Sequence, residues 1–147
     1  MAAFTGFKHN RNLGWDGIRV EKFIVAGGYT LTEGDAVSLV TGSSSAAMPN
    51  GTVRPMATNG VCLGVVRTRG ATTGGEEVEI QLVTRSGGAI FEVDDNGLAA
   101  ALLVKGLTLD VASGGAYVAT PTNSDLRIYS YDSDTGIVEV MFLDPVF

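Results

Sequence analysis

The stretch GYTLTEGDAVSLV (residues 28–40) consists of two apolar runs that meet at Glu33-Gly34-Asp35. Glycine adopts positive φ angles at little steric cost, and aspartate hydrogen-bonds nearby backbone groups, so this tripeptide is typical of a tight turn. The sequence therefore predicts a β-hairpin. We interpret this hairpin as part of a rigid scaffold and not as a catalytic loop.

Turn signals such as Gly27-Gly28, Gly74-Gly75 and Gly87-Gly88 recur along the chain and separate short apolar segments. Alternation is clearest in EVEIQL (residues 77–82), where every second residue is apolar, as in a strand with one face on a core. This spacing predicts an all-β fold, mainly β with at most one short helix, arranged as a compact β-sandwich or small β-barrel. The expected strands are residues 19–25, 36–40, 61–67, 77–83, 89–93, 107–111, 116–120, 126–131 and 137–143.

One segment departs from this pattern. LAAALLV (residues 98–104) is rich in helix-forming residues, with Asn96 before it and Gly106 after it. We predict a short helix of about two turns, with Asn96 near its N-cap and Gly106 as a left-handed stop. A buried strand is the alternative for this segment.

The chain has 147 residues, which corresponds to about one domain with a core of its own. The single cysteine, Cys62, cannot form an intramolecular disulfide, and its apolar neighbours predict a small buried side chain. Residues 1–6 do not resemble a signal peptide, and no run of about 18 apolar residues occurs. We therefore expect a protein that folds in a reducing cytoplasm.

The formal net charge is −6, but the charge is unevenly distributed. Residues 1–22 carry four basic and two acidic residues, whereas the rest of the chain is acidic and its basic residues are scattered. Binding to nucleic acid or to an anionic membrane requires clustered lysine and arginine. The sequence therefore predicts neither nucleic acid nor membrane as a partner.

Two regions lack the periodicity of strands and helices. Residues 1–18 mix isolated aromatic residues with glycine, asparagine and basic residues, and we interpret them as an extended N-terminal arm ahead of a single β-domain over residues 19–147. Residues 41–60 contain two prolines and many small polar residues, which predicts a long loop.

The residues that usually carry catalysis are scarce. His9 is the only histidine, and we expect it to face solvent or a partner, because local spacing assembles no Ser-His-Asp or Cys-His arrangement. One histidine and one cysteine cannot supply a tetrahedral zinc site without unusual help from carboxylates. GATTGG (residues 70–75) lacks the lysine of a phosphate-binding loop. We therefore expect a protein that is not an enzyme and uses no cofactor or metal.

Two acidic clusters have structural explanations. DSDTG (residues 132–136) has the alternating carboxylates that calcium prefers, but it lacks a third acidic ligand and a distal glutamate, so we interpret it as a hairpin loop. DDNG (residues 94–97) is typical of a turn that leads into a helix cap. A glycosidase would need carboxylates such as Glu77, Glu79 or Asp94 across a cleft, which the sequence cannot place.

Three segments follow one another in an order that suggests a family: GDAVSLV (residues 34–40), GVCLGVV (residues 60–66) and, after a glycine loop, VEIQLV (residues 78–83). This succession resembles the capsid decoration, or cement, proteins of tailed bacteriophages, over roughly residues 19–93. The resemblance implies a compact β-domain on the outer surface of an icosahedral capsid, commonly as a homotrimer, which binds the major capsid protein and stabilises contacts between its subunits. Such a protein is synthesised in the host cytoplasm and resides in the virion.

In this family an N-terminal arm often adds to strands of the capsid. Aromatic and arginine side chains are frequent anchors at interfaces, and an extended arm can add a strand to a partner. The expected partner-binding residues in residues 1–18 are Phe4, Phe7, Lys8, Arg11 and Trp15. Packing of the aromatic residues onto their own domain is the alternative.

Two other classes of function remain open from the sequence. A carbohydrate-binding or host-adhesion module on a virion surface would need several aromatic side chains on one face, and Tyr129 and Tyr131 are two apart in an expected strand. Trp15, Tyr29 and Tyr117 could add further stacking surfaces. A small β-barrel hydrolase is the other alternative.

Overall fold

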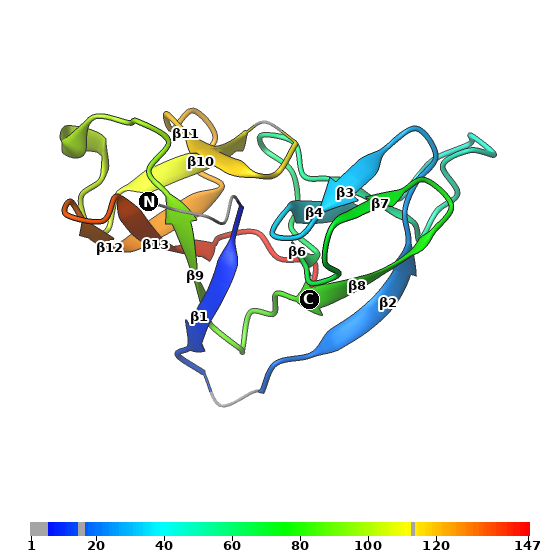
Figure 1. Cartoon of the computed structure of the whole chain (residues 1–147), viewed down its shortest axis with the longest axis horizontal. Helices are drawn as coiled ribbons and strands as arrows, with labels where there is room; N and C mark the ends of the chain where they lie inside the picture. The colour runs from blue at the N-terminus through cyan, green and yellow to red at the C-terminus, as the bar shows by residue number, and fades with distance from the viewer. Residues whose placement is uncertain (1–5, 15–16, 113) are drawn as a thin grey trace.

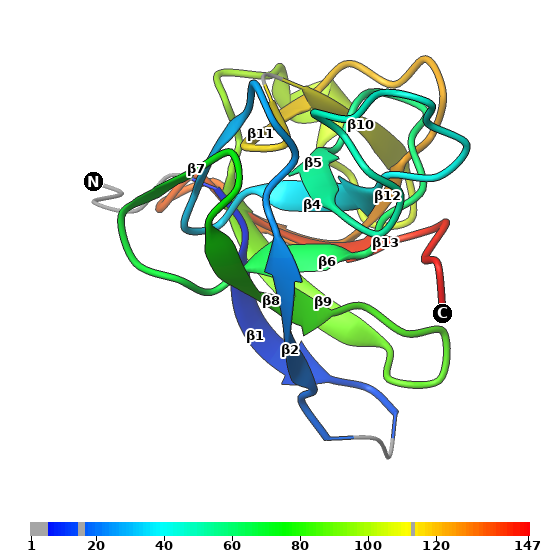
Figure 2. The same cartoon turned by 90° about the vertical axis from the view of Figure 1, so that its right-hand side faces the viewer.

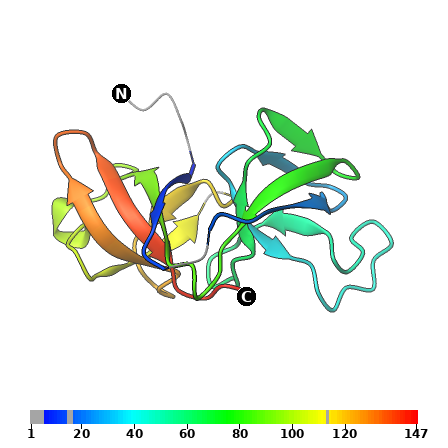
Figure 3. The ribbon, with the colours of Figure 1, turned by 90° about the horizontal axis from the view of Figure 1, so that it is seen from below.

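The computed structural model describes residues 6–14, 17–112 and 114–147. The predicted all-β class is confirmed: two main antiparallel sheets pack as a sandwich, and the described residues form no closed barrel. Figure 1 shows the two sheets on opposite sides of the molecule, and Figure 3 shows them side by side from below. Each expected strand overlaps an observed one.

The larger sheet has six strands in the order β1-β9-β13-β12-β10-β11. All of its neighbouring strands run antiparallel, and the last two strands in sequence, β12 and β13, form a hairpin at its centre. The strands are β1 (Lys8–Asn12), β9 (Ala89–Asp94), β10 (Thr108–Ala112), β11 (Tyr117–Ala119), β12 (Leu126–Asp132) and β13 (Ile137–Phe142).

The second sheet has five strands in the order β2-β8-β6-β4-β5, and Figure 2 shows β4, β6 and β8 in succession. A two-stranded sheet of β3 and β7 lies beside it. The strands are β2 (Val20–Ile24), β3 (Thr30–Thr32), β4 (Ala36–Leu39), β5 (Val53–Pro55), β6 (Gly64–Val66), β7 (Ala71–Thr73) and β8 (Glu77–Leu82).

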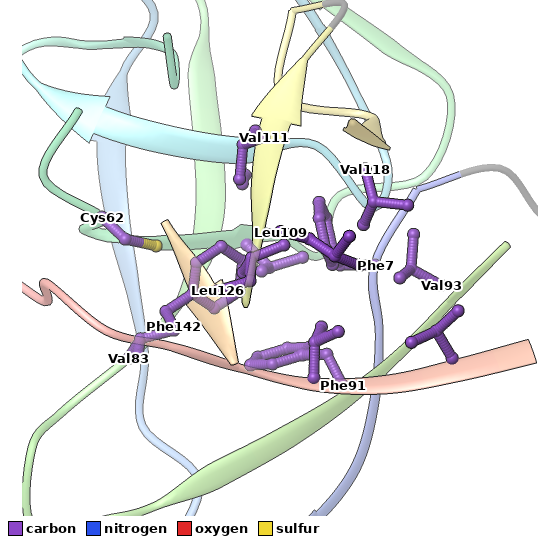
Figure 4. Packing of buried hydrophobic residues seen from close by; sticks show 14 of the residues in the cluster. Phe7, Cys62, Val83, Phe91, Val93, Leu109, Val111, Val118, Leu126 and Phe142 are labelled. Carbon is purple, nitrogen blue, oxygen red and sulfur yellow. The ribbon is translucent and has the colours of Figure 1, made fainter. Parts of the chain in front are cut away.

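The hydrophobic interior consists of two clusters of buried side chains, which lie on opposite faces of β6. The first cluster lies under the six-stranded sheet and includes Phe7, Phe91 and Phe142 (Figure 4). The second is formed by side chains of the five-stranded sheet together with Leu31 of β3. Successive side chains of a strand point to opposite faces, so Val65 of β6 belongs to the first cluster and Val66 to the second. The sulfur-bearing Cys62 is fully buried in the first cluster, as predicted.

The turn at Glu33-Gly34-Asp35 forms as predicted, but the hairpin does not. The backbone N–H of Asp35 donates to the carbonyl of Thr32, and Gly34 has a φ of 92°. β3 then pairs with β7, whereas β4 pairs with β5 and β6. The prediction of a hairpin was wrong because the turn directs its two strands into different sheets, where each finds a longer-range partner.

The helix predicted over residues 98–104 is reduced to one turn of 3-10 helix, η1 (Ala100–Leu102). Its N-cap is Ala99 without a side-chain hydrogen bond, and Asn96 instead adopts a φ of 52° and donates from its side chain to the carbonyl of Val118. Gly106 has the expected positive φ of 90°. The alternative of a buried strand is wrong, because none of the three helical residues is buried.

Two regions expected to lack regular structure contain strands. Within residues 41–60, β5 forms the edge of the five-stranded sheet, where Pro55 needs to donate no hydrogen bond. Within residues 1–18, β1 pairs with β9 and Phe7 is 1% exposed. The described residues 6–14 are therefore not a separate extended arm. They belong to the six-stranded sheet because β9 offers a strand edge and the core offers a place for the Phe7 ring.

Candidate functional site

The outer face of the six-stranded sheet carries a polar cluster centred on Glu139 of β13. Two β-bulges supply its members, one between His9 and Arg11 in β1 and one between Ile128 and Ser130 in β12. A bulge adds a residue to one strand and interrupts the inside-outside alternation of its side chains. As a result, two neighbouring residues of each bulged strand reach the outer face. We call this set the Glu139 cluster: Asn10, Arg11, Tyr129, Ser130 and Glu139.

Glu139 is tied to both bulged strands. The guanidinium of Arg11 donates to its carboxylate at 2.8 Å, and the hydroxyl of Ser130 donates at 2.5 Å. The amide of Asn10 also donates to Glu139. The hydrogen bond from Arg11 holds the pKa of the Glu139 carboxyl below its usual value, although partial burial acts in the opposite direction. The carboxylate is therefore ionised and saturated with donors, which suits a fixed recognition surface better than a proton-transfer group.

Tyr129 stands between two cations. The Arg11 guanidinium lies 5.1 Å from the centre of its ring and the Lys105 ammonium lies 5.0 Å from it. Cations at such distances are attracted to the electron-rich faces of aromatic rings. Tyr129 is thus an aromatic surface flanked by two cations, of which Arg11 is also ion-paired with Glu139.

The bulge separates Tyr129 from Tyr131, contrary to the expectation that they share a face. Tyr131 packs against the first core cluster and donates its hydroxyl to Asp95 at 2.9 Å. Tyr129, in contrast, contacts the cations of the outer face. Tyr29 is also turned inward, against the second core cluster. The tyrosine pair on which the carbohydrate-binding alternative depended is therefore not formed.

The five predicted partner-binding residues have different fates. Phe4 and Trp15 lie outside the described residues. Phe7 is corrected from an anchor to a core residue, because its ring packs against Phe142 with 5.1 Å between centroids. Lys8 is exposed and lies opposite Glu92 in the β1-β9 register. Arg11 is exposed and joins the Glu139 cluster.

Asn10, Ser130 and Glu139 are the members of the cluster that sequence reasoning did not assign to a binding site, and Tyr129 was considered only for the carbohydrate-binding alternative. A signal for Glu139 was present, because it is the polar residue in the alternating segment Ile137-Val138-Glu139-Val140. No feature of the sequence indicated the two bulges. Without the bulges, the sequence could not show which residues of β1 and β12 lie next to Glu139.

The expectation that His9 faces solvent is wrong, and the other possibility, that it faces a partner, stays a prediction. His9 is half-buried, its ring meets Phe91 edge-on with 5.7 Å between centroids, and its Nε2 lies 2.9 Å from Oδ1 of Asn12. The Cys62 thiol is fully buried, and burial raises its pKa far above the ordinary value. A thiol in that state is a poor nucleophile at neutral pH.

The acidic segments form turns. Asp94 and Asp95 accept hydrogen bonds from the backbone N–H groups of Asn96 and Gly97, and DSDTG closes the β12-β13 hairpin as predicted. Across the described ranges, no group of three or more histidine, cysteine, aspartate or glutamate side chains is arranged to hold a metal ion. The same residues include no helix with the length and apolar character needed to cross a membrane.

Comparisons with protein-family models, with curated proteins and with solved structures give no match to this chain.

Proposed function

We propose that this chain is a non-enzymatic structural protein of a viral capsid, a decoration or cement protein that binds the outer surface of an icosahedral phage head. The observation that supports this most is the arrangement of the three segments that carry the resemblance. They provide β4, β6 and β8, which are consecutive strands at the centre of one sheet. Segments that resemble one family in order along the chain thus form one structural unit.

The outer face of the six-stranded sheet is the proposed contact face for the major capsid protein. Interfaces are enriched in tyrosine and arginine at their centres, and the Arg11-Tyr129-Lys105 surface supplies both, with Arg11 ion-paired to Glu139. Lys8 adds a further cation beside it. Phe4 and Trp15 remain proposed anchors, and a homotrimer remains the proposed oligomer.

Such a protein would act by mass action. Binding to the assembled, expanded shell and not to free subunits lowers the free energy of the shell. Many copies on one lattice reinforce one another, because each attached copy holds its neighbours' binding sites in place. Rigidity helps, since a contact face already fixed by hydrogen bonds loses little entropy on binding.

The test is co-sedimentation of the purified chain with expanded phage shells that lack decoration. The structure determines the variants: removing residues 1–18 would remove β1 and Phe7, so the truncated chain should begin at Gly6 instead. Full-length protein should bind saturably, and the Arg11→Ala/Lys105→Ala double variant should bind more weakly. Lys22→Ala, which removes a cation from the five-stranded sheet, should bind like the parent.

Loss of binding on removal of residues 1–5 would assign attachment to Phe4 and its neighbours. Loss only in the Arg11→Ala/Lys105→Ala variant would assign it to the outer face. Failure of the full chain to bind cognate shells, while it remains folded, would overturn the proposed function.

A further inference from the structure

An open cleft of about 380 Å³ lies beside β1, between the two sheets. Figure 1 shows β1 on the side of the six-stranded sheet that faces β6 and β8. The cleft has apolar walls, which include Phe7, Val65 and Ile18, and this size is within the range of small-molecule sites. Its polar residues are Lys8, His9, Glu33, Arg67 and Gln81.

The most informative of these residues is Gln81, which is polar and yet only 2% exposed. Its side-chain oxygen accepts a hydrogen bond from Nη1 of Arg67 at 2.7 Å. Arginine can only donate, so this contact fixes the amide orientation: the oxygen faces Arg67 and the NH₂ group points elsewhere.

The NH₂ group of Gln81 makes no hydrogen bond to any described residue. Its nitrogen is not fully buried, so it can be reached from solvent. Because this NH₂ group reaches solvent and has no protein partner, its hydrogen bonds go to an acceptor from outside the chain, either water or a ligand. Gln81 lines this cleft and also a much smaller pocket beside Thr84 and Ala89, so the cleft is one of two places where an acceptor can reach it.

The neighbouring charges indicate what kind of acceptor fits. Arg67 uses one of its donors on Gln81 and forms no ion pair with a described residue. Its remaining donors can attract an anion. Glu33 lines the same cleft and repels negative charge, and this repulsion is greater for a doubly charged phosphate than for a singly charged carboxylate.

We propose that this cleft binds a carboxylate carried on a short apolar body, with Gln81 and Arg67 as its donors and Phe7, Val65 and Ile18 as the apolar contact. The carboxylate has two sources of the same chemistry, a small organic acid or the C-terminus of a peptide. This inference does not rest on capsid attachment, because its two donors lie outside the proposed contact face.

The experiment is a titration of the ¹⁵N-labelled full chain followed by NMR. The probes are butyrate, a short apolar peptide with a free C-terminus, the same peptide with a C-terminal amide, and methyl phosphate. We expect saturable shifts of the Gln81 side-chain NH₂ signals and the Arg67 Nε–H signal with butyrate or the free peptide. Tighter binding of the peptide identifies a chain terminus as the source, and tighter binding of butyrate identifies a small acid.

Gln81→Glu is the decisive variant. Its carboxylate still accepts the hydrogen bond from Arg67, but it has lost the NH₂ donors and repels the ligand, so binding should weaken at least about tenfold. Gln81→Met serves the same purpose should the glutamate variant fold poorly. Lys22→Gln, on the exposed face of β2, is the control and should bind like the parent.

Three results would overturn the proposal. They are no shift at tens of millimolar of any carboxylate, equal binding of the amidated peptide or of methyl phosphate, and unchanged carboxylate binding by a folded Gln81→Glu or Gln81→Met variant.

Discussion

The ring of Phe7 packs against the ring of Phe142, with 5.1 Å between their centroids and 56° between their planes. Phe91 completes the group with an edge-on contact to Phe142 at 5.5 Å. The contact between Phe7 and Phe142 joins the residue before the first strand to the last residue of the final strand. The backbone of Phe7 is held elsewhere, because its N–H donates to the carbonyl of Gly34, in the turn between β3 and β4, at 2.7 Å.

Phe7→Ala should therefore destabilise the protein by about 3–5 kcal/mol, because it leaves a cavity among buried aromatic rings. Chemical denaturation measures this change. Leu13→Ala is the matched control in the same segment, since Leu13 is 53% exposed and should change stability by less than about 0.5 kcal/mol. Equal stability of the two variants would contradict the core assignment of Phe7.

Gly64→Ala should destabilise the contact between β6 and β8. A Cβ at Gly64 would lie 2.1 Å from the carbonyl oxygen of Gln81, and neither strand can move without disturbing the core. We expect a loss of about 1–3 kcal/mol or more. Gly17→Ala, where a Cβ would meet nothing within 4 Å, should be neutral or slightly stabilising. A comparison of thermal melts separates the two, and a neutral Gly64→Ala would show that β6 and β8 do not approach each other this closely at Gly64.

Asp110→Ala should destabilise the loop before β12. The Asp110 carboxylate is 2% exposed and accepts hydrogen bonds from the backbone N–H groups of Thr122, Asn123 and Ser124. Removing the carboxylate leaves these donors without their acceptor and should lower the free energy of unfolding by an amount on the order of 3 kcal/mol. Hydrogen exchange of the three amides should accelerate. Asp134→Ala, in the exposed β12-β13 turn, is the control, and similar exchange rates in both variants would argue against this role.

Asp35 should make stability depend on pH. Burial raises the pKa of its carboxyl to about 6, although the N–H of Thr32 partly opposes this by donating to the charged form. A raised folded-state pKa means that Asp35 contributes most below its unfolded pKa of about 4, and that this contribution is lost as the pH rises through about 6.

The variant that isolates this effect is Asp35→Asn. It should match the parent in stability near pH 4 and exceed it near pH 7 by at most about 3 kcal/mol, because it buries no charge. Urea denaturation of both proteins across this range gives the difference. A difference that does not change with pH would rule out Asp35 as its source.

Local patterns in the sequence located most of the fold. The alternation in EVEIQL and the apolar runs around Cys62 depend only on which residues face a core, and the corresponding strands form where expected. Pairing was less accessible. Nothing within Gly28–Val40 indicates that β3 pairs with β7, whose residues are about 40 positions later in the chain. The length of the helix around Ala100 was overestimated, because the high helix propensity of this segment is not supported by burial of the helical residues.

The candidate site was harder to anticipate. Arg11 was selected for its residue type, and the structure places it in the Glu139 cluster. Phe7 was selected by the same reasoning and is buried, because residue type does not distinguish an interface anchor from a core residue. Gln81 looked like a solvent-facing residue of an alternating strand, and its burial becomes visible only when β2 and β6 flank β8.

The position of β6 between the two hydrophobic clusters has a thermodynamic consequence. Val65 and Val66 are neighbours in one strand, and each completes a different cluster, so neither cluster keeps its boundary once the other melts. We expect the calorimetric and van't Hoff enthalpies of unfolding to agree, as they do in an all-or-none transition. The molecule is divided in space, but it should unfold as one cooperative unit.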